Sequence, residues 1–224
     1  MGTALEPLVV LNFKAYTQAI GQNALKLAKI AKGVSEATGV RVIIAPQSAD
    51  LKAVSKIIET YAQHIDPISP GSGTGAQLTE ATKLAGATGS LINHSEKRIE
   101  LEQIEKSIKK LHELGMKALV CSHNADSSKA YAAFNPDFIA VEPPALIGSG
   151  VSVSTANPEI ITDTIAKIRE VNQETIVLCG AGISNGVDVK KAVELGVSGV
   201  LLASAFTKAE DPKAVLEDIC GGYK

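Results

Sequence analysis

Short apolar runs alternate along the chain with segments whose apolar residues recur at helical spacing. Eight runs rich in β-branched residues are mostly apolar on both faces, which is typical of strands in a buried parallel sheet. The predicted strands are Leu8–Leu11, Arg41–Ala45, Tyr61–His64, Ser90–Asn93, Lys117–Cys121, Phe138–Val141, Thr175–Cys179 and Gly199–Leu202. Between them, Leu101, Ile104, Ile108 and Leu111 are spaced to lie on one face of a helix.

Helix ends are indicated by glycine, proline and capping residues. Asn157 and Asp211 each precede a proline, which predicts an N-cap followed by proline in the first helical turn. Four segments end a predicted helix with a glycine, which suits the left-handed conformation that closes a helix, and enter a strand shortly afterwards. These glycines are Gly39, Gly86, Gly115 and Gly196.

The repeated strand–helix unit predicts an α/β fold, a (β/α)8 TIM barrel forming one domain over residues 1–224. Eight strands in 224 residues give about 28 residues per unit, and such barrels typically have about 250 residues. An open doubly wound sheet is the alternative. A dinucleotide-binding version would carry a G-x-G-x-x-G loop after its first strand. Here that strand leads into Asn12-Phe13-Lys14, which favours the barrel.

Composition excludes several classes of protein. Hydrophobic residues make up 45% of the chain and the net charge is −2, so the chain can bury a core and has no basic run for nucleic acid. Its apolar runs are far shorter than the roughly 20 residues that span a membrane, and the N-terminal residues lead us to expect no secretory signal. Cys121, Cys179 and Cys220 are far apart, which indicates reduced thiols. We expect a soluble cytoplasmic protein without nucleic-acid or membrane partners.

Polar residues follow several predicted strands, at the end of a barrel where chemistry is located. Lys14 follows the first strand, His94 the fourth and Glu142 the sixth. A lysine, a histidine and a glutamate at one rim could bind an anion, polarise a carbonyl and abstract a proton. Because Glu142 closes the apolar run Phe138–Val141, burial should raise the pKa of its carboxyl group.

Each of these residues also has an interpretation without function. Taken alone, Lys14 is typical of a solvated loop charge and His94 of a structural histidine. The other histidines carry weaker cases: His64 can bond to the rim, His112 is expected to be solvated, and His123 has no partner evident in the sequence. No Cys/His cluster has metal-ligand spacing, so we predict no metal site.

Two loops are suited to enclosing a ligand. Residues Pro143–Gly150 combine two prolines, apolar residues and glycines, which predicts a hinged lid. Gly180–Ser184 after the seventh strand and Ala203-Ser204 after the eighth offer backbone N–H groups where barrels of this kind bind phosphate.

Five blocks of sequence together resemble the triosephosphate isomerase family, and most closely its short archaeal branch. They are Asn12–Lys14, Asn93–Glu96, Ala140–Gly150, Cys179–Ser184 and Gly199–Ser204. The blocks lie in order from end to end, so the resemblance covers essentially the whole chain. It implies a cofactor-free and metal-free isomerase that interconverts D-glyceraldehyde 3-phosphate and dihydroxyacetone phosphate through an enediolate.

The resemblance also implies roles for individual residues. Glu142 is the base, in the pairing of a glutamate base with a neutral histidine for which this family is known. His94 is the neutral electrophile, which a helix N-terminus just after it would keep neutral. Lys14 supplies positive charge, Asn12 orients the substrate and Glu96 holds Lys14. The remaining substrate-binding residues, mostly through backbone N–H groups, are Phe13, Ile147, Gly148, Gly182, Ala203 and Ser204.

The chain departs from the family pattern at the lid and at a predicted subunit contact. The lid begins Pro-Pro-Ala where many members have Pro-x-Trp. Ser69–Ala76 resembles the loop that reaches into a neighbouring subunit, but Gly73 stands where archaeal relatives often have His, and Leu51–Tyr61 is shorter than in relatives. We still expect a homo-oligomer, a tetramer or a dimer.

Three other functions are possible for a phosphate-binding barrel, and each would need different residues. A Schiff-base aldolase would need a lysine inside the barrel, and the runs Ala118–Cys121 and Phe138–Glu142 contain none. A pentose-phosphate epimerase would need metal-binding His and Asp residues at strand ends. A catalytically idle phosphate-binding barrel would be expected to lose Glu142, His94 or Lys14, and all three are present.

Overall fold

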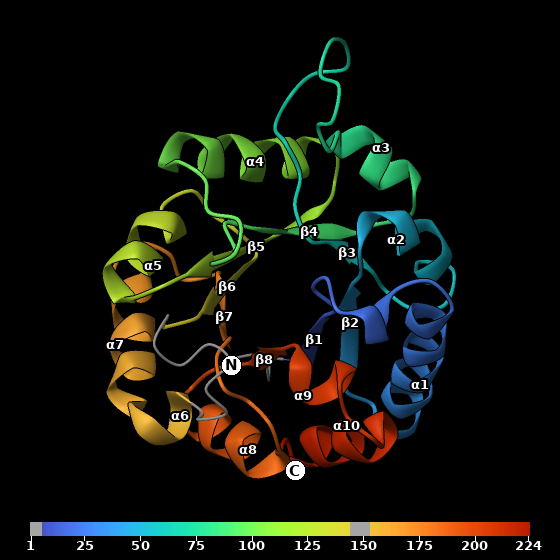
Figure 1. The fold of residues 1–224 in the computed structure, drawn as a ribbon. Helices are drawn as coiled ribbons and strands as arrows, with labels where there is room; N and C mark the ends of the chain where they lie inside the picture. The colour runs from blue at the N-terminus through green and yellow to red at the C-terminus, as the bar shows by residue number, and fades with distance from the viewer. Residues whose placement is uncertain (1–5, 144–152) are drawn as a thin grey trace.

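The strands form one parallel sheet that curls into a barrel with the helices outside it (Figure 1). The structure is a computed structural model that describes residues 6–143 and 153–224. The strands are β1 Leu8–Asn12, β2 Arg41–Ala45, β3 Tyr61–Ala62, β4 Gly89–Ile92, β5 Lys117–Ser122, β6 Phe138–Val141, β7 Ile176–Cys179 and β8 Gly199–Leu202. Their order is β2-β1-β8-β7-β6-β5-β4-β3. A parallel bridge between Ile44 in β2 and Thr60, the residue before β3, brings the two edge strands together. The predicted (β/α)8 barrel is confirmed.

Helices follow the strands around the ring (Figure 1). They are the 3₁₀ turn η1 Thr17–Ala19 and α1 Gln22–Thr38, α2 Ser48–Val54, α3 Thr79–Leu84, α4 Leu101–Glu113, α5 Ala125–Ala132, α6 Val153–Ala156, α7 Pro158–Arg169, α8 Gly186–Glu194, α9 Ser204–Thr207 and α10 Pro212–Gly221. In α4 the predicted apolar face is buried at Ile104, Ile108 and Leu111, whereas Leu101 is half-exposed at the helix start. No helix in the described ranges is long and apolar enough to cross a membrane.

The predicted element boundaries hold closely, with two informative exceptions. The four helix-closing glycines all have positive φ, as predicted. The third strand ends at Ala62 rather than His64. The next residue, Gln63, donates through its side chain to the Lys14 and Ala45 carbonyls. Asp211 caps α10 by accepting from the Ala214 N–H, but Asn157 makes no side-chain cap bond at the start of α7.

The interior of the barrel is filled with side chains and is not a channel. An inner cluster includes Leu8, Tyr61, Phe138 and Leu201, while a larger cluster packs the outer face of the sheet against the helices. The three cysteines are free and buried. Since apolar side chains fill the middle, a ligand can reach only the ends of the barrel.

Candidate active site

The three predicted catalytic side chains lie at the carboxyl ends of β1, β4 and β6. His94 and Glu142 are buried, with 6% and 4% of their surfaces exposed. The His94 Nε2 atom lies 3.8 Å from Glu142 Oε2, and Lys14 Nζ lies 3.0 Å from Glu96 Oε1. The strands therefore bring a carboxyl group, an imidazole and a cation, far apart in the sequence, into one site.

The backbone of Lys14 has an unusual conformation, which three hydrogen bonds hold in place. Its φ of 48° is left-handed, which is uncommon outside glycine. The Asn12 Oδ1 atom accepts from the Lys14 N–H at 2.9 Å, and the side-chain amides of Gln47 and Gln63 donate to the Lys14 carbonyl at 2.8 and 2.9 Å. These bonds hold the Lys14 backbone, and the ion pair with Glu96 holds its ammonium group.

Sequence reasoning missed Gln47 and Gln63. The sequence could have indicated them only by position, because Gln47 follows β2 and Gln63 follows β3 at the functional end of the barrel. Nothing in the sequence identified the Lys14 carbonyl as their shared partner. Both bonds join residues more than thirty positions apart, since the pairs are separated by 33 and 49 residues.

His94 is kept neutral by its surroundings. Burial lowers the pKa of His94 to about 4, with help from the positive charge of Lys14. The Glu96 N–H donates to His94 Nδ1 at 3.2 Å, so the ring proton is on Nε2, the atom nearest Glu142. The expected helix N-terminus after His94 is wrong, because α4 begins only at Leu101. Burial and one backbone N–H take its place.

Glu142 has the properties of a base that works at neutral pH. Burial raises the pKa of Glu142 to about 7, against opposing effects of the Cys121 thiol and Lys14. Its Oε2 atom has no hydrogen-bond partner among the described residues. A carboxyl group with a pKa near the working pH is suited to both take and return a proton.

Gly180 provides the space that Glu142 occupies. A Cβ atom built at Gly180 would lie 2.4 Å from Glu142 Cγ and 3.1 Å from the Val141 carbonyl oxygen. From the sequence, Gly180 was expected only as part of the phosphate loop. The structure shows that it is also required by the packing of the carboxylate.

A cleft of about 300 Å³ opens beside Glu142 and Lys14. The segments after β7 and β8 form its far side, including Gly182, Ala203 and Ser204. Ala203 is the N-cap of α9, and its short helix begins at Ser204. Backbone N–H groups at this position suit an anionic group, and the volume suits a small molecule.

One predicted binding residue, Phe13, does not line this cleft. Phe13 is fully buried and stacks on Phe206, with ring centroids 6.4 Å apart, so its side chain is part of the core and does not reach the cleft. Ile147 and Gly148 in the predicted lid lie outside the described residues. Within those residues, no group of three His, Cys, Asp or Glu side chains could hold a metal ion.

The loop between β3 and α3 projects from the barrel (Figure 1). Its base is held by Asp66, which accepts from the Gln77 N–H at 2.7 Å and lies 3.1 Å from the His64 ring. Ser69–Ala76 occupies the outer part. His64 therefore does bond at the rim. His112 is exposed, as predicted, and its Nε2 atom lies 2.9 Å from Asp137 Oδ2.

The family model and the relatives that match this chain all carry the same description. A family model described as triosephosphate isomerase matches residues 7–221. A triosephosphate isomerase of Methanothermus fervidus is 55% identical over 215 residues, covering 95% of this chain and 97% of that protein. Proteins of the same name from Methanobacterium bryantii and Methanocaldococcus jannaschii are 51% and 50% identical, each over 95% of this chain and over 95% and 98% of their own.

Proposed function

The chain belongs to the triosephosphate isomerase family, and from that premise we propose that its rim residues interconvert D-glyceraldehyde 3-phosphate and dihydroxyacetone phosphate. One observation carries the proposal. A buried carboxyl group with a pKa of about 7 lies 3.8 Å from a buried, neutral imidazole, at the edge of a cleft that also contains a lysine. This arrangement suits proton transfer between adjacent carbons without a cofactor.

The mechanism follows from the two protonation states. Glu142 removes a proton from the carbon next to the substrate carbonyl and returns it to the neighbouring carbon. His94 donates its Nε2 proton in a hydrogen bond to the oxygen on which negative charge develops. It passes that proton to this oxygen and takes up the hydroxyl proton of the neighbouring oxygen, so that the carbonyl and hydroxyl groups exchange places. Lys14 stabilises that charge, and Asn12 orients the substrate through the loop it shares with Lys14. Fixed donors of this kind act most strongly on charge that forms only in the transition state.

The phosphate group would bind at the segments after β7 and β8. Gly182, Ala203 and Ser204 line the cleft there, and their backbone N–H groups are the proposed donors. The resemblance adds Ile147 and Gly148 from the lid. Ser184 is less available, since both its N–H and its hydroxyl donate to Asp188 Oδ2 at 3.0 Å.

Turnover of D-glyceraldehyde 3-phosphate by the purified protein, followed in a coupled assay, tests the function. We expect isomerisation in both directions in the presence of a metal chelator. Absence of turnover from a folded protein that still binds inorganic phosphate would contradict the proposal and favour the idle barrel.

We also propose that the protein is a homo-oligomer in which Ser69–Ala76 contacts a second copy. The loop stands away from its own barrel (Figure 1), and a groove of about 210 Å³ beside Lys14 and His94, lined also by Gln63 and His64, opens near its base. Size-exclusion chromatography with light scattering should show a dimer or tetramer. A strictly monomeric protein with full activity would contradict this role of the loop.

The compartment and the domain count follow from the same reasoning. Triose-phosphate isomerisation is a step of glycolysis and gluconeogenesis, and the free, buried thiols fit a reducing cytoplasm. One eight-stranded sheet contains strands from both ends of the described chain, which supports a single domain over residues 1–224.

A further inference from the structure

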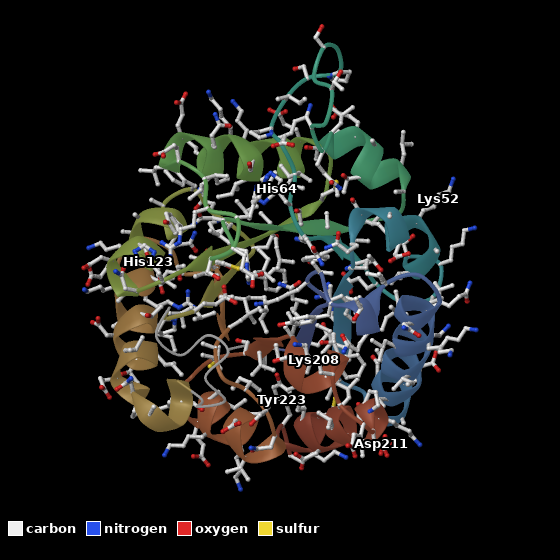
Figure 2. All side chains as sticks on the ribbon, in the orientation of Figure 1. Lys52, His64, His123, Lys208, Asp211 and Tyr223 are labelled. Atoms are coloured by element: carbon white, nitrogen blue, oxygen red, sulfur yellow. The ribbon has the colours of Figure 1, made fainter. Side chains whose placement is uncertain are left out.

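A very small cavity lies on the other side of Glu142 from the cleft residues of β8. Its volume is about 10 Å³, and its lining residues are Asn93, Ser95, Arg98, Cys121, Ser122, His123 and Glu142. Two of these residues carry a buried polar atom without a hydrogen-bond partner among the described residues: Glu142 Oε2 and His123 Nδ1. His123 comes directly after β5, beside α5 (Figure 2).

This cavity can hold one water molecule. A cavity needs roughly 10–15 Å³ to contain a water, and the water needs two or more polar partners. A carboxylate oxygen and an unprotonated imidazole nitrogen are both acceptors. A water has two protons to donate, so one water that reaches both atoms satisfies both. Leaving either buried acceptor unpaired is unfavourable.

The charges around the two groups are consistent with this pairing. Burial and the nearby positive charge of Arg98 lower the pKa of His123, so the ring is neutral and one nitrogen is free to accept. On its other sides the Glu142 carboxyl group faces His94, the Cys121 thiol and the charges of Lys14 and Glu96.

We propose that His123 is a positioning residue for Glu142, acting through one water bound in this cavity. The water donates one hydrogen bond to Glu142 Oε2 and one to His123 Nδ1. It holds the carboxylate in place and favours its charged form. The proposal rests on the role of Glu142 as the base, and it gives a use to a histidine that the mechanism otherwise leaves out.

Substitutions at His123 distinguish the loss of its hydrogen-bond acceptor from the loss of its side-chain volume. His123→Leu removes the acceptor, so the water loses a partner and protonated Glu142 is favoured. The acidic limb of kcat/KM should move up by at least about 0.5 pH unit, which is a threefold loss of activity at pH 6. His123→Met gives the same expectation if the leucine variant is unstable. His123→Asn keeps an amide oxygen near the position of Nδ1 and should restore the wild-type profile. His112→Leu, at a histidine paired with Asp137, is the matched control and should cause no shift.

A direct titration makes the test independent of turnover. The Glu142 carboxyl carbon is followed by NMR in protein labelled with ¹³C-glutamate, and its signal is assigned by its loss in Glu142→Gln. An upward shift of the titration in His123→Leu that is absent in His123→Asn supports the proposal, even if the wild type proves not to isomerise triose phosphates. Coincident titrations of wild type and His123→Leu, or equal shifts in the leucine and asparagine variants, would overturn it.

Discussion

Replacing Glu142 with Gln is expected to lower kcat by about 10³- to 10⁴-fold, the upper part of the range for loss of a general base. The amide nearly matches the carboxyl group in shape, so the buried site and its neighbours stay in place, but it cannot take a proton. Steady-state kinetics in the coupled assay measure the loss. Equal kcat values for wild type and variant would remove Glu142 from the mechanism.

The same variant should be more stable than the wild type at alkaline pH. The carboxyl pKa rises from about 4.5 to about 7 on folding, so the folded state holds the proton more tightly. Stability from this group is present below pH 4.5 and is lost as the pH rises to 7. That difference corresponds to roughly 3 kcal/mol. Thermal unfolding should show a higher Tm for Glu142→Gln at pH 8 and little difference near pH 4.5. An equal difference at both pH values would contradict the buried-base account.

Gly180→Ala is expected to lower kcat by one to two orders of magnitude without preventing folding. The new Cβ would lie 2.4 Å from Glu142 Cγ, so the carboxylate must move, and a displacement of about 1 Å at a reacting group can cost about a hundredfold in rate. The assay is again steady-state turnover, with circular dichroism to verify the fold.

Gly33→Ala provides the matched control for that substitution. Gly33 lies within α1, and a Cβ there meets nothing within 4 Å. Alanine should leave kcat unchanged and stabilise the helix by about 0.5–1 kcal/mol. Wild-type kcat in Gly180→Ala would show that the glycine does not position Glu142.

The parts of the fold that depend on local signals could be predicted from the sequence. Apolar runs located the eight strands, and glycines marked helix ends such as Gly39 and Gly196, because both signals act within a few residues. Because the active sites of such barrels lie at the carboxyl ends of the strands, Lys14, His94 and Glu142 could then be predicted to lie close together. Their roles came from the resemblance to a family.

What could not be predicted depends on tertiary contacts. Phe13 sits between two site residues in sequence, yet its side chain enters the core and stacks on Phe206. Asn93 directly follows β4 in a left-handed conformation with φ of 60°, and the Ile99 N–H donates to its Oδ1 at 3.1 Å. The Gln63 side chain donates to the carbonyls of Lys14 and Ala45, which belong to the first and second strand–loop units. No spacing in the sequence reports such contacts.

The pH dependence of kcat/KM for D-glyceraldehyde 3-phosphate, measured on the wild-type protein, tests the central claim most directly. A base that must be ionised, with a pKa of about 7 in the free enzyme, predicts turnover that is constant above that pH and falls tenfold per unit below it. His94 should add no further limb near neutrality, since its pKa is about 4. Absence of turnover, or an acidic limb at the ordinary carboxyl value near pH 4.5, would contradict a buried glutamate base beside a neutral histidine.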